Sequence, residues 1–210
     1  LSEAESYSKQ ELQALNFANE ALLDAFSYFY LDAKTQIEDT YRDDVKTKRY
    51  IQENTKHYQV SETTYQTSEK VDVNIYIEIH TLLRPIILSQ STIKDNPPIP
   101  QNYSGIIIDA RSIDFKPVLF PTITKGSQKW LLASYFSEDS AKTKLPFIYS
   151  NTAAHPSVIK RVGRTPAIYQ AESSYKDTIQ LNEANVPQLT TTEAKALLAN
   201  GTVVILLSNP

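Results

Sequence analysis

The middle of the chain contains the stretch Gly105-Ile106-Ile107-Ile108-Asp109-Ala110-Arg111, which is followed by Lys116-Pro117 and Pro121. A short apolar run that ends at turn residues is typical of a β-strand. The stretch therefore predicts a strand over 105–109, with an acidic and a basic side chain at the point where the strand ends.

Asp109 and Arg111 are the candidate site residues of this stretch, together with Lys116. Residues two apart on an extended chain project to the same side. We expect the pair to bond the backbone of the loop 112–117 and so to fix a structural corner. Two alternatives remain open. One is a ligand-binding module with an anion-binding pocket at Asp109, Arg111 and Lys116. The other is an acid/base hydrolase that uses Asp109, although a lone carboxylate lacks a second catalytic group.

The remainder of the second half predicts further strands and a closing helix. Apolar segments over 130–136 and 167–171 indicate β-structure, and prolines punctuate the loop between them. Thr190-Thr191-Thr192-Glu193 is a helix-start pattern, and Asn200-Gly201 is typical of a helix end. A strand over 203–207 is expected to close the chain.

The first half predicts a helix packed on a β-hairpin. Ser8-Lys9-Gln10-Glu11 has the form of a capping box, after which apolar residues recur at three- and four-residue steps up to Phe29. Strict alternation over 71–79 predicts a strand with one buried face, paired with an alternating segment over 56–67. Between these parts, Thr40 is expected to cap a short helix that carries Val45 and Ile51 on its inner side.

A proline-rich segment, Asn96-Pro97-Pro98-Ile99-Pro100, separates the two halves. Three prolines in four residues do not fit a helix interior or a strand ladder, and they stiffen an extended chain. We expect an α+β protein of two small domains. Residues 1–93 form the helix packed on an antiparallel β-hairpin, 94–102 the linker, and 103–210 a mixed α/β domain.

Composition argues against several kinds of function. The net charge of −3 supplies no basic field for nucleic acid, and the four glycines are too few and too scattered for a nucleotide-binding loop. The chain has no cysteine, and its three histidines lie far apart in sequence. Neither feature fits a metal site. No cofactor, metal ion or catalytic residue is predicted.

The chain offers no segment that could cross a membrane as a helix, since no apolar run approaches the roughly 20 residues required. It contains no methionine and begins at Leu1. These features lead us to expect a processed product, joined to a membrane only through a removed, lipidated leader.

The chain resembles a group of bacterial envelope lipoproteins that includes small outer-membrane lipoproteins and flagellar-assembly lipoproteins of the FlgP type. The resemblance rests on the helix at 14–30, the strand pair ending at 71–83, and the run Tyr103 to Arg111 with Pro117 and Pro121-Thr122-Ile123. It continues through Arg161-Val162-Gly163, Asp177-Thr178-Ile179 and the segment 192–205. Two places depart from the pattern: Ser112 stands where the family usually has glycine, and residues 128–158 resemble the family poorly.

This resemblance implies a lipid-anchored protein of the bacterial periplasm or outer membrane, and it implies no enzyme. In that group, self-association is common, and some members belong to flagellar basal structures. We therefore expect a structural or assembly component that works through protein partners in the cell envelope and through copies of itself.

Overall fold

A computed structural model describes residues 3–67, 70–184, 187 and 189–208 of the chain, with side chains from residue 7 onward. The chain divides into two compact units. The first unit comprises Leu1–Phe29 and Gln36–Pro85, and the second comprises Tyr30–Thr35 and Ile86–Pro210. The predicted proline-rich linker at 94–102 falls within the second unit.

The first unit contains most of the helices and a two-stranded antiparallel sheet. Its elements are α1 (Glu3–Ser27), α2 (Ile37–Tyr41), α3 (Val45–Asn54), the 3-10 turn η1 (Thr55–His57), β1 (Gln59–Thr67), β2 (Lys70–Tyr76) and α4 (Ile79–Gln90), whose last residues belong to the second unit. No helix of the described residues has both the length and the hydrophobicity to span a lipid bilayer.

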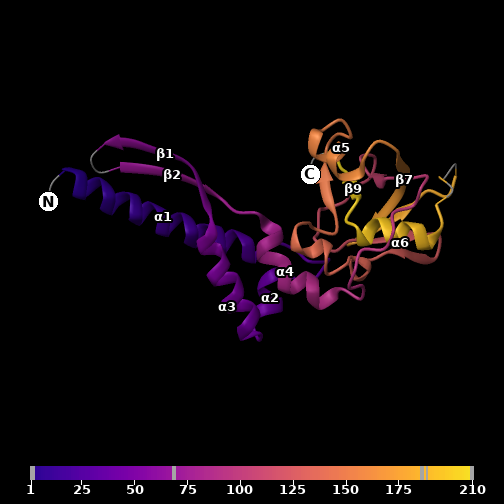
Figure 1. Cartoon of the computed structure of the whole chain (residues 1–210), viewed down its shortest axis with the longest axis horizontal. Coiled ribbons are helices and arrows are strands. Elements are labelled where there is room, and N and C mark those ends of the chain that lie inside the picture. Colours follow the sequence, from indigo (N-terminus) through magenta and orange to yellow (C-terminus); the bar gives the residue numbers. More distant parts are fainter. Residues whose placement is uncertain (1–2, 68–69, 185–186, 188, 209–210) are drawn as a thin grey trace. The chain divides into compact units, whose positions relative to one another are not determined.

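The hairpin β1–β2 packs on α1 through one face, as expected. Side chains along β2 alternate between exposed and half-buried, and the half-buried ones include Val71, Val73 and Ile75. α1 runs alongside β2 (Figure 1). Farther along, the Tyr65 ring of β1 meets the edge of Tyr7, with ring centres 5.6 Å apart, and the Tyr65 hydroxyl donates to Glu11 Oε2 at 2.8 Å. This pairing confirms the predicted helix-on-hairpin arrangement.

Two helix starts in the first unit differ from the prediction. α1 begins at Glu3, so the Ser8 capping pattern lies inside a helix that has already started. Asp44, not Thr40, caps α3, because its carboxylate accepts from the amides of Lys46 and Thr47. Ile51 of α3 is buried as expected, whereas Val45 is 77% exposed. The charged side chain immediately before the helix satisfied the free amides better than a more distant threonine.

A further correction concerns the end of the predicted strand at 71–79. The strand β2 stops at Tyr76, and Ile79 starts α4. The apolar residues that follow recur at helical spacing, namely Ile79, Leu82, Leu83, Ile86 and Ile87, and the last four are buried. Pro85 lies inside this helix. The sequence did not predict this helix, because proline normally interrupts a helix and Pro85 lies within the apolar pattern.

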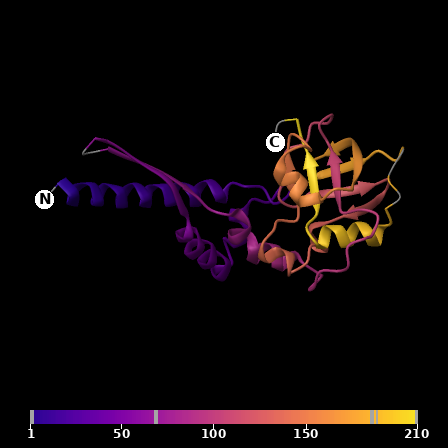
Figure 2. The ribbon, with the colours of Figure 1, turned by 45° about the horizontal axis from the view of Figure 1, so that its top comes forward.

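The second unit is built on a mixed seven-stranded sheet with strand order β5-β4-β8-β7-β3-β9-β6. Its strands are β3 (Gly105–Asp109), β4 (Thr122–Lys125), β5 (Gln128–Leu131), β6 (Ile148–Ser150), β7 (Pro166–Tyr175), β8 (Thr178–Leu181) and β9 (Val203–Leu206), with 3-10 turns η2 (Ala133–Tyr135) and η3 (Ser140–Lys142). β3 is an interior strand that lies between β7 and β9 and runs parallel to both (Figure 2). The apolar segment 130–136 is strand only as far as Leu131.

The isoleucines of β3 are buried on both faces of this sheet. Ile106 and Ile108 pack in the main core with Leu197 and Leu198 of α6 (Thr191–Ala199). Ile107 packs on the other face with Val158 and Val162 of α5 (Pro156–Val162). Both faces of β3 are therefore covered, which explains why its sequence is continuously apolar instead of alternating.

The closing helix and strand confirm the prediction for the end of the chain. Thr190 Oγ1 accepts from the amide of Glu193, and Glu193 Oε2 accepts from the amide of Thr190, which is a reciprocal capping box. Gly201 has a φ of 66°, so the helix ends with a residue in the left-handed region. The α+β fold class predicted from the sequence is confirmed.

Candidate functional site

Asp109 and Arg111 lie at the carboxyl end of β3. Asp109 is in register with Gln170 of β7 on one side and with Leu206 of β9 on the other. Its carboxylate accepts two hydrogen bonds from the Arg111 guanidinium, Nε to Oδ1 at 2.8 Å and Nη2 to Oδ2 at 2.6 Å. This geometry is the bidentate pairing that makes arginine–carboxylate contacts strong and directional.

The electrostatics of this pair follow from the contact. The hydrogen bonds from Arg111 hold the pKa of the Asp109 carboxyl below its usual range, against an opposing effect of partial burial. The Asp109 side chain is 14% exposed and that of Arg111 is 48% exposed. The carboxylate is thus kept ionised and already bonded, an arrangement that suits a fixed contact better than a group that must exchange a proton.

Among the described residues, the hydrogen bonds of the pair join it to itself, to Gln170 and to Ser208, and none reaches the loop 112–117. The Arg111 amide donates to Asp109 Oδ1 at 3.3 Å, and the Arg111 carbonyl accepts from the hydroxyl of Ser208, just beyond β9. Arg111 also lines a hollow of about 300 Å³ with Ser112, Phe115 and Ser208. Ser112 makes its turn without a positive φ, since Lys176 is the one non-glycine residue of the described chain with that geometry.

Lys116 lies in a loop that is anchored by hydrogen bonds between Val118 of the loop and the Tyr149 side chain. The Tyr149 hydroxyl donates to the Val118 carbonyl at 2.6 Å and accepts from the Val118 amide at 3.3 Å. Burial raises the pKa of the Tyr149 phenol, so it stays protonated and able to donate. The exposed Lys116 side chain lines a second hollow, of about 280 Å³, with Tyr30 and Lys176.

The structure therefore brings Asp109 and Arg111 together and assigns Lys116 to a different hollow. Sequence reasoning missed Gln170, whose side chain also bonds Asp109, and Ser208. Gln170 comes from the neighbouring strand β7 and Ser208 from the segment just after β9, and both lie far away in sequence. No local signal marks them, because strand order decides which residues meet at a sheet edge.

The histidines remain separate from this corner. His155 caps α5, where its Nδ1 accepts from the Ser157 amide at 3.3 Å, and His80 Nδ1 lies 3.3 Å from Glu78 Oε2. Across 3–67, 70–184, 187 and 189–208, no three of the histidine and acidic side chains lie close enough together to hold a metal ion.

The fold and this corner define a two-unit α+β protein whose second unit is built on a mixed sheet with a bidentate ion pair at the end of its interior strand β3. Residues 105–209 match the family described as Treponema pallidum Tp0624, second domain. The match covers half of the chain, and the chain belongs to this bacterial family. No curated protein matches the chain.

Proposed function

We propose that the chain is a non-enzymatic structural or assembly component of the bacterial cell envelope that works through contacts with other proteins and with its own copies. The observation that carries this proposal is the incomplete burial of α1. Between Tyr7 and Ala25, no side chain of this long helix is buried, although the helix carries a regular apolar face.

The limited burial has a simple structural cause. The sheet that α1 packs on has only two strands, so it covers one side of the helix, and the other main contacts of α1 are with the short elements α2 and η1. Leu12 is 61% exposed and Phe17 is 60% exposed on the remaining surface. β1 pairs only with β2 among the described strands, so its other edge has no partner strand there. Exposed apolar groups and open strand edges are features through which proteins associate.

The envelope location is the second part of the proposal. It rests on the resemblance of the sequence to envelope lipoproteins, and the family of residues 105–209 supports a bacterial setting. Within that setting we propose a FlgP-like protein, anchored by a lipidated leader in the periplasm or outer membrane, with flagellar structures among the complexes it serves.

The contact function is tested by sedimentation velocity of the purified chain over a range of concentrations. Self-association is expected to rise with concentration, and L12Q/F17Q is expected to weaken it by about tenfold, because each side chain contributes apolar area to the contact. The matched control is I159Q, which removes a side chain of similar exposure from α5. A monomer at every concentration, together with no co-purified partner after cross-linking in the source bacterium, would count against the proposal.

The location is tested on the full-length gene product in its own bacterium. Metabolic labelling with a clickable palmitate analogue is expected to mark the protein, and fractionation is expected to place it with the envelope. Unlabelled protein in the cytoplasmic fraction would contradict the location without affecting the contact function.

A further inference from the structure

The first unit contains a groove between the carboxyl-terminal part of α1, α2 and α3. It has a volume of about 400 Å³. We call it the acidic groove and define it by Glu20, Asp24, Tyr28, Glu38, Tyr41 and Ile51. All six residues belong to the first unit. Its size lies within the range of sites that hold a small ligand or a few side chains of a partner.

The rim of the groove carries three carboxylates without a cationic partner. Glu20 and Asp24 are four residues apart on α1, so they share one face of the helix, and Glu38 comes from α2. None of the three takes part in an ion pair within the described chain. Like charges at this helical spacing destabilise a helix, so this arrangement costs stability.

The floor of the groove is apolar and aromatic. Ile51 and Tyr41 are buried beneath it, and Tyr28 stands at the rim with 58% of its surface exposed. Burial raises the pKa of the Tyr41 phenol, and the charges of Glu38 and Asp24 raise it further. The negative potential of Glu38 and Asp24 therefore reaches the floor of the groove. The floor itself offers apolar and aromatic surface.

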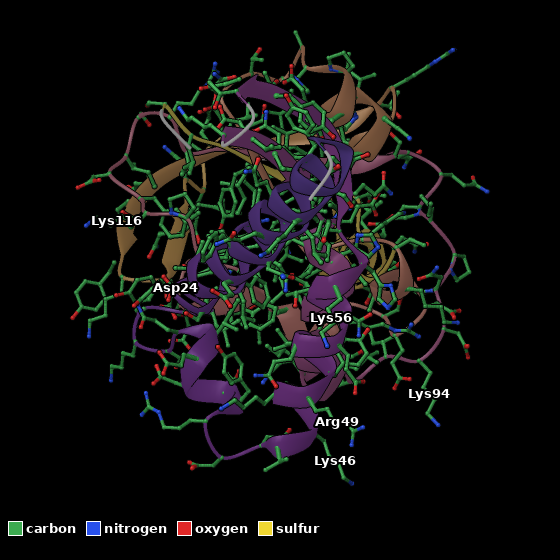
Figure 3. All side chains as sticks on the ribbon, turned by 90° about the vertical axis from the view of Figure 1, so that its left-hand side faces the viewer. Asp24, Lys46, Arg49, Lys56, Lys94 and Lys116 are labelled. Atoms are coloured by element: carbon green, nitrogen blue, oxygen red, sulfur yellow. The ribbon has the colours of Figure 1, made fainter. Side chains whose placement is uncertain are left out.

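The positive charges of α3 neutralise only part of the negative charge of the acidic groove. Lys48 is the one cation among its lining residues. Lys46 and Arg49 project from α3 away from Asp24 (Figure 3), and Arg49 is already paired with Glu53 at 2.8 Å. The lining therefore keeps an excess of two negative charges, given three carboxylates against one ammonium group.

We infer that the acidic groove binds an arginine-bearing segment of a partner protein, with apolar residues flanking the arginine. This inference rests on the proposed function, since it names the chemistry of one partner contact. A guanidinium can bond two carboxylates at once, and it stacks on tyrosine rings. Its aliphatic stem and its apolar neighbours match the floor formed by Ile51 and Tyr41.

The test uses the full chain and two short fluorescein-labelled peptides measured by fluorescence anisotropy. One alternates arginine with leucine, and the other has citrulline, a neutral isostere, in place of each arginine. The arginine peptide is expected to bind about tenfold more tightly than the citrulline peptide at about 0.05 M salt and to weaken at about 0.5 M, because charges at the rim are screened.

Two variants separate the groove from general electrostatic attraction. E20Q/D24N/E38Q is expected to weaken binding of the arginine peptide by about tenfold. D43N/D95N/E172Q changes the net charge equally at exposed acids outside the groove and is expected to bind like the parent. Circular dichroism confirms that both variants are folded.

The inference is overturned if the two variants bind equally, if citrulline replaces arginine without loss, or if the arginine peptide fails to bind at about 1 mM. It is also overturned if E20Q/D24N/E38Q reduces self-association while leaving peptide binding unchanged, since the occupant would then be a second copy. Peptide binding does not depend on assembly in the cell. Failure of the proposed function and failure of this inference are therefore distinguishable.

Discussion

The two units use the same construction, a helix packed on a sheet, with different results. In the second unit, α6 packs on a seven-stranded sheet, and Leu197 and Leu198 are completely buried. In the first unit, the much longer α1 packs on a two-stranded sheet, and its apolar residues between Tyr7 and Ala25 are half-buried or exposed. The comparison teaches that an amphipathic pattern fixes which face of a helix turns inward, whereas the width of the opposing surface fixes how deeply that face is buried.

The largest expected effect contrasts the two helices directly. L197A in α6 is expected to lower the free energy of unfolding by about 3 to 4 kcal/mol, because it leaves a cavity in a closed core. L15A in α1 is expected to cost about 1 kcal/mol, because the half-buried Leu15 contributes less. Urea unfolding measures both, with fluorescence of the buried Trp130 reporting on the second unit. Equal losses would show that the helices are equally buried in solution.

The next effect tests how tightly the second unit is packed. A Cβ at Gly105 would lie 2.6 Å from Val162 Cα, so G105A forces β3 and α5 apart and is expected to cost about 2 to 3 kcal/mol. G126A, where φ is +57°, would mainly meet the movable end of the Glu183 side chain and is expected to cost about 1 kcal/mol. Thermal unfolding of the two variants compares them. A smaller loss for G105A would contradict the close contact.

A third prediction compares two capping patterns that look alike in the sequence. T190A is expected to cost about 1 kcal/mol, since Thr190 caps α6 in a reciprocal box. S8A is expected to be neutral or to stabilise by about 0.5 kcal/mol, since Ser8 lies inside α1 and alanine is the better helix former. Chemical denaturation separates these outcomes. A cost at Ser8 equal to that at Thr190 would place the start of α1 at Ser8.

The smallest effect concerns the ion pair at the end of β3. D109N is expected to lower the free energy of unfolding by about 0.5 to 1 kcal/mol at neutral pH, since it removes a bidentate bond to a half-exposed arginine. The pKa of Asp109 is lowered in the folded chain. Its contribution is therefore complete above the unfolded pKa of about 3.9, and it is lost as the pH falls through the lower folded value.

The stability difference between the parent and D109N should therefore shrink as the pH drops below about 4. Urea unfolding at a series of pH values measures this trend, and D139N provides a control at the exposed pair with Lys142. A difference that grows on acidification would show that Asp109 is not ionised and bonded in the folded chain.

The fold was largely predictable wherever the signal was local. The strand at Gly105–Asp109, the alternation of Val71, Val73 and Ile75, and the Thr190 cap each follow from the chemistry of a few neighbouring residues. α4 was missed because Pro85 interrupts a pattern that tertiary burial then favours. Of the three candidate site residues, the sequence correctly paired Asp109 with Arg111 but not Lys116 with either of them. Asp109 and Arg111 meet because they are near in sequence, whereas Lys116 lines a different hollow from Arg111, in a loop whose Val118 bonds Tyr149 of the distant strand β6.

The α+β class, the isoleucine strand and the alternating face of β2 follow from the amino-acid sequence alone, because periodicity and capping act over one or two turns of chain. The strand order, the depth at which each face is buried and the meeting of Glu20, Asp24 and Glu38 around one groove emerge only in the folded chain. These features depend on which distant segments pack together, and that choice is made by the surface available to each face.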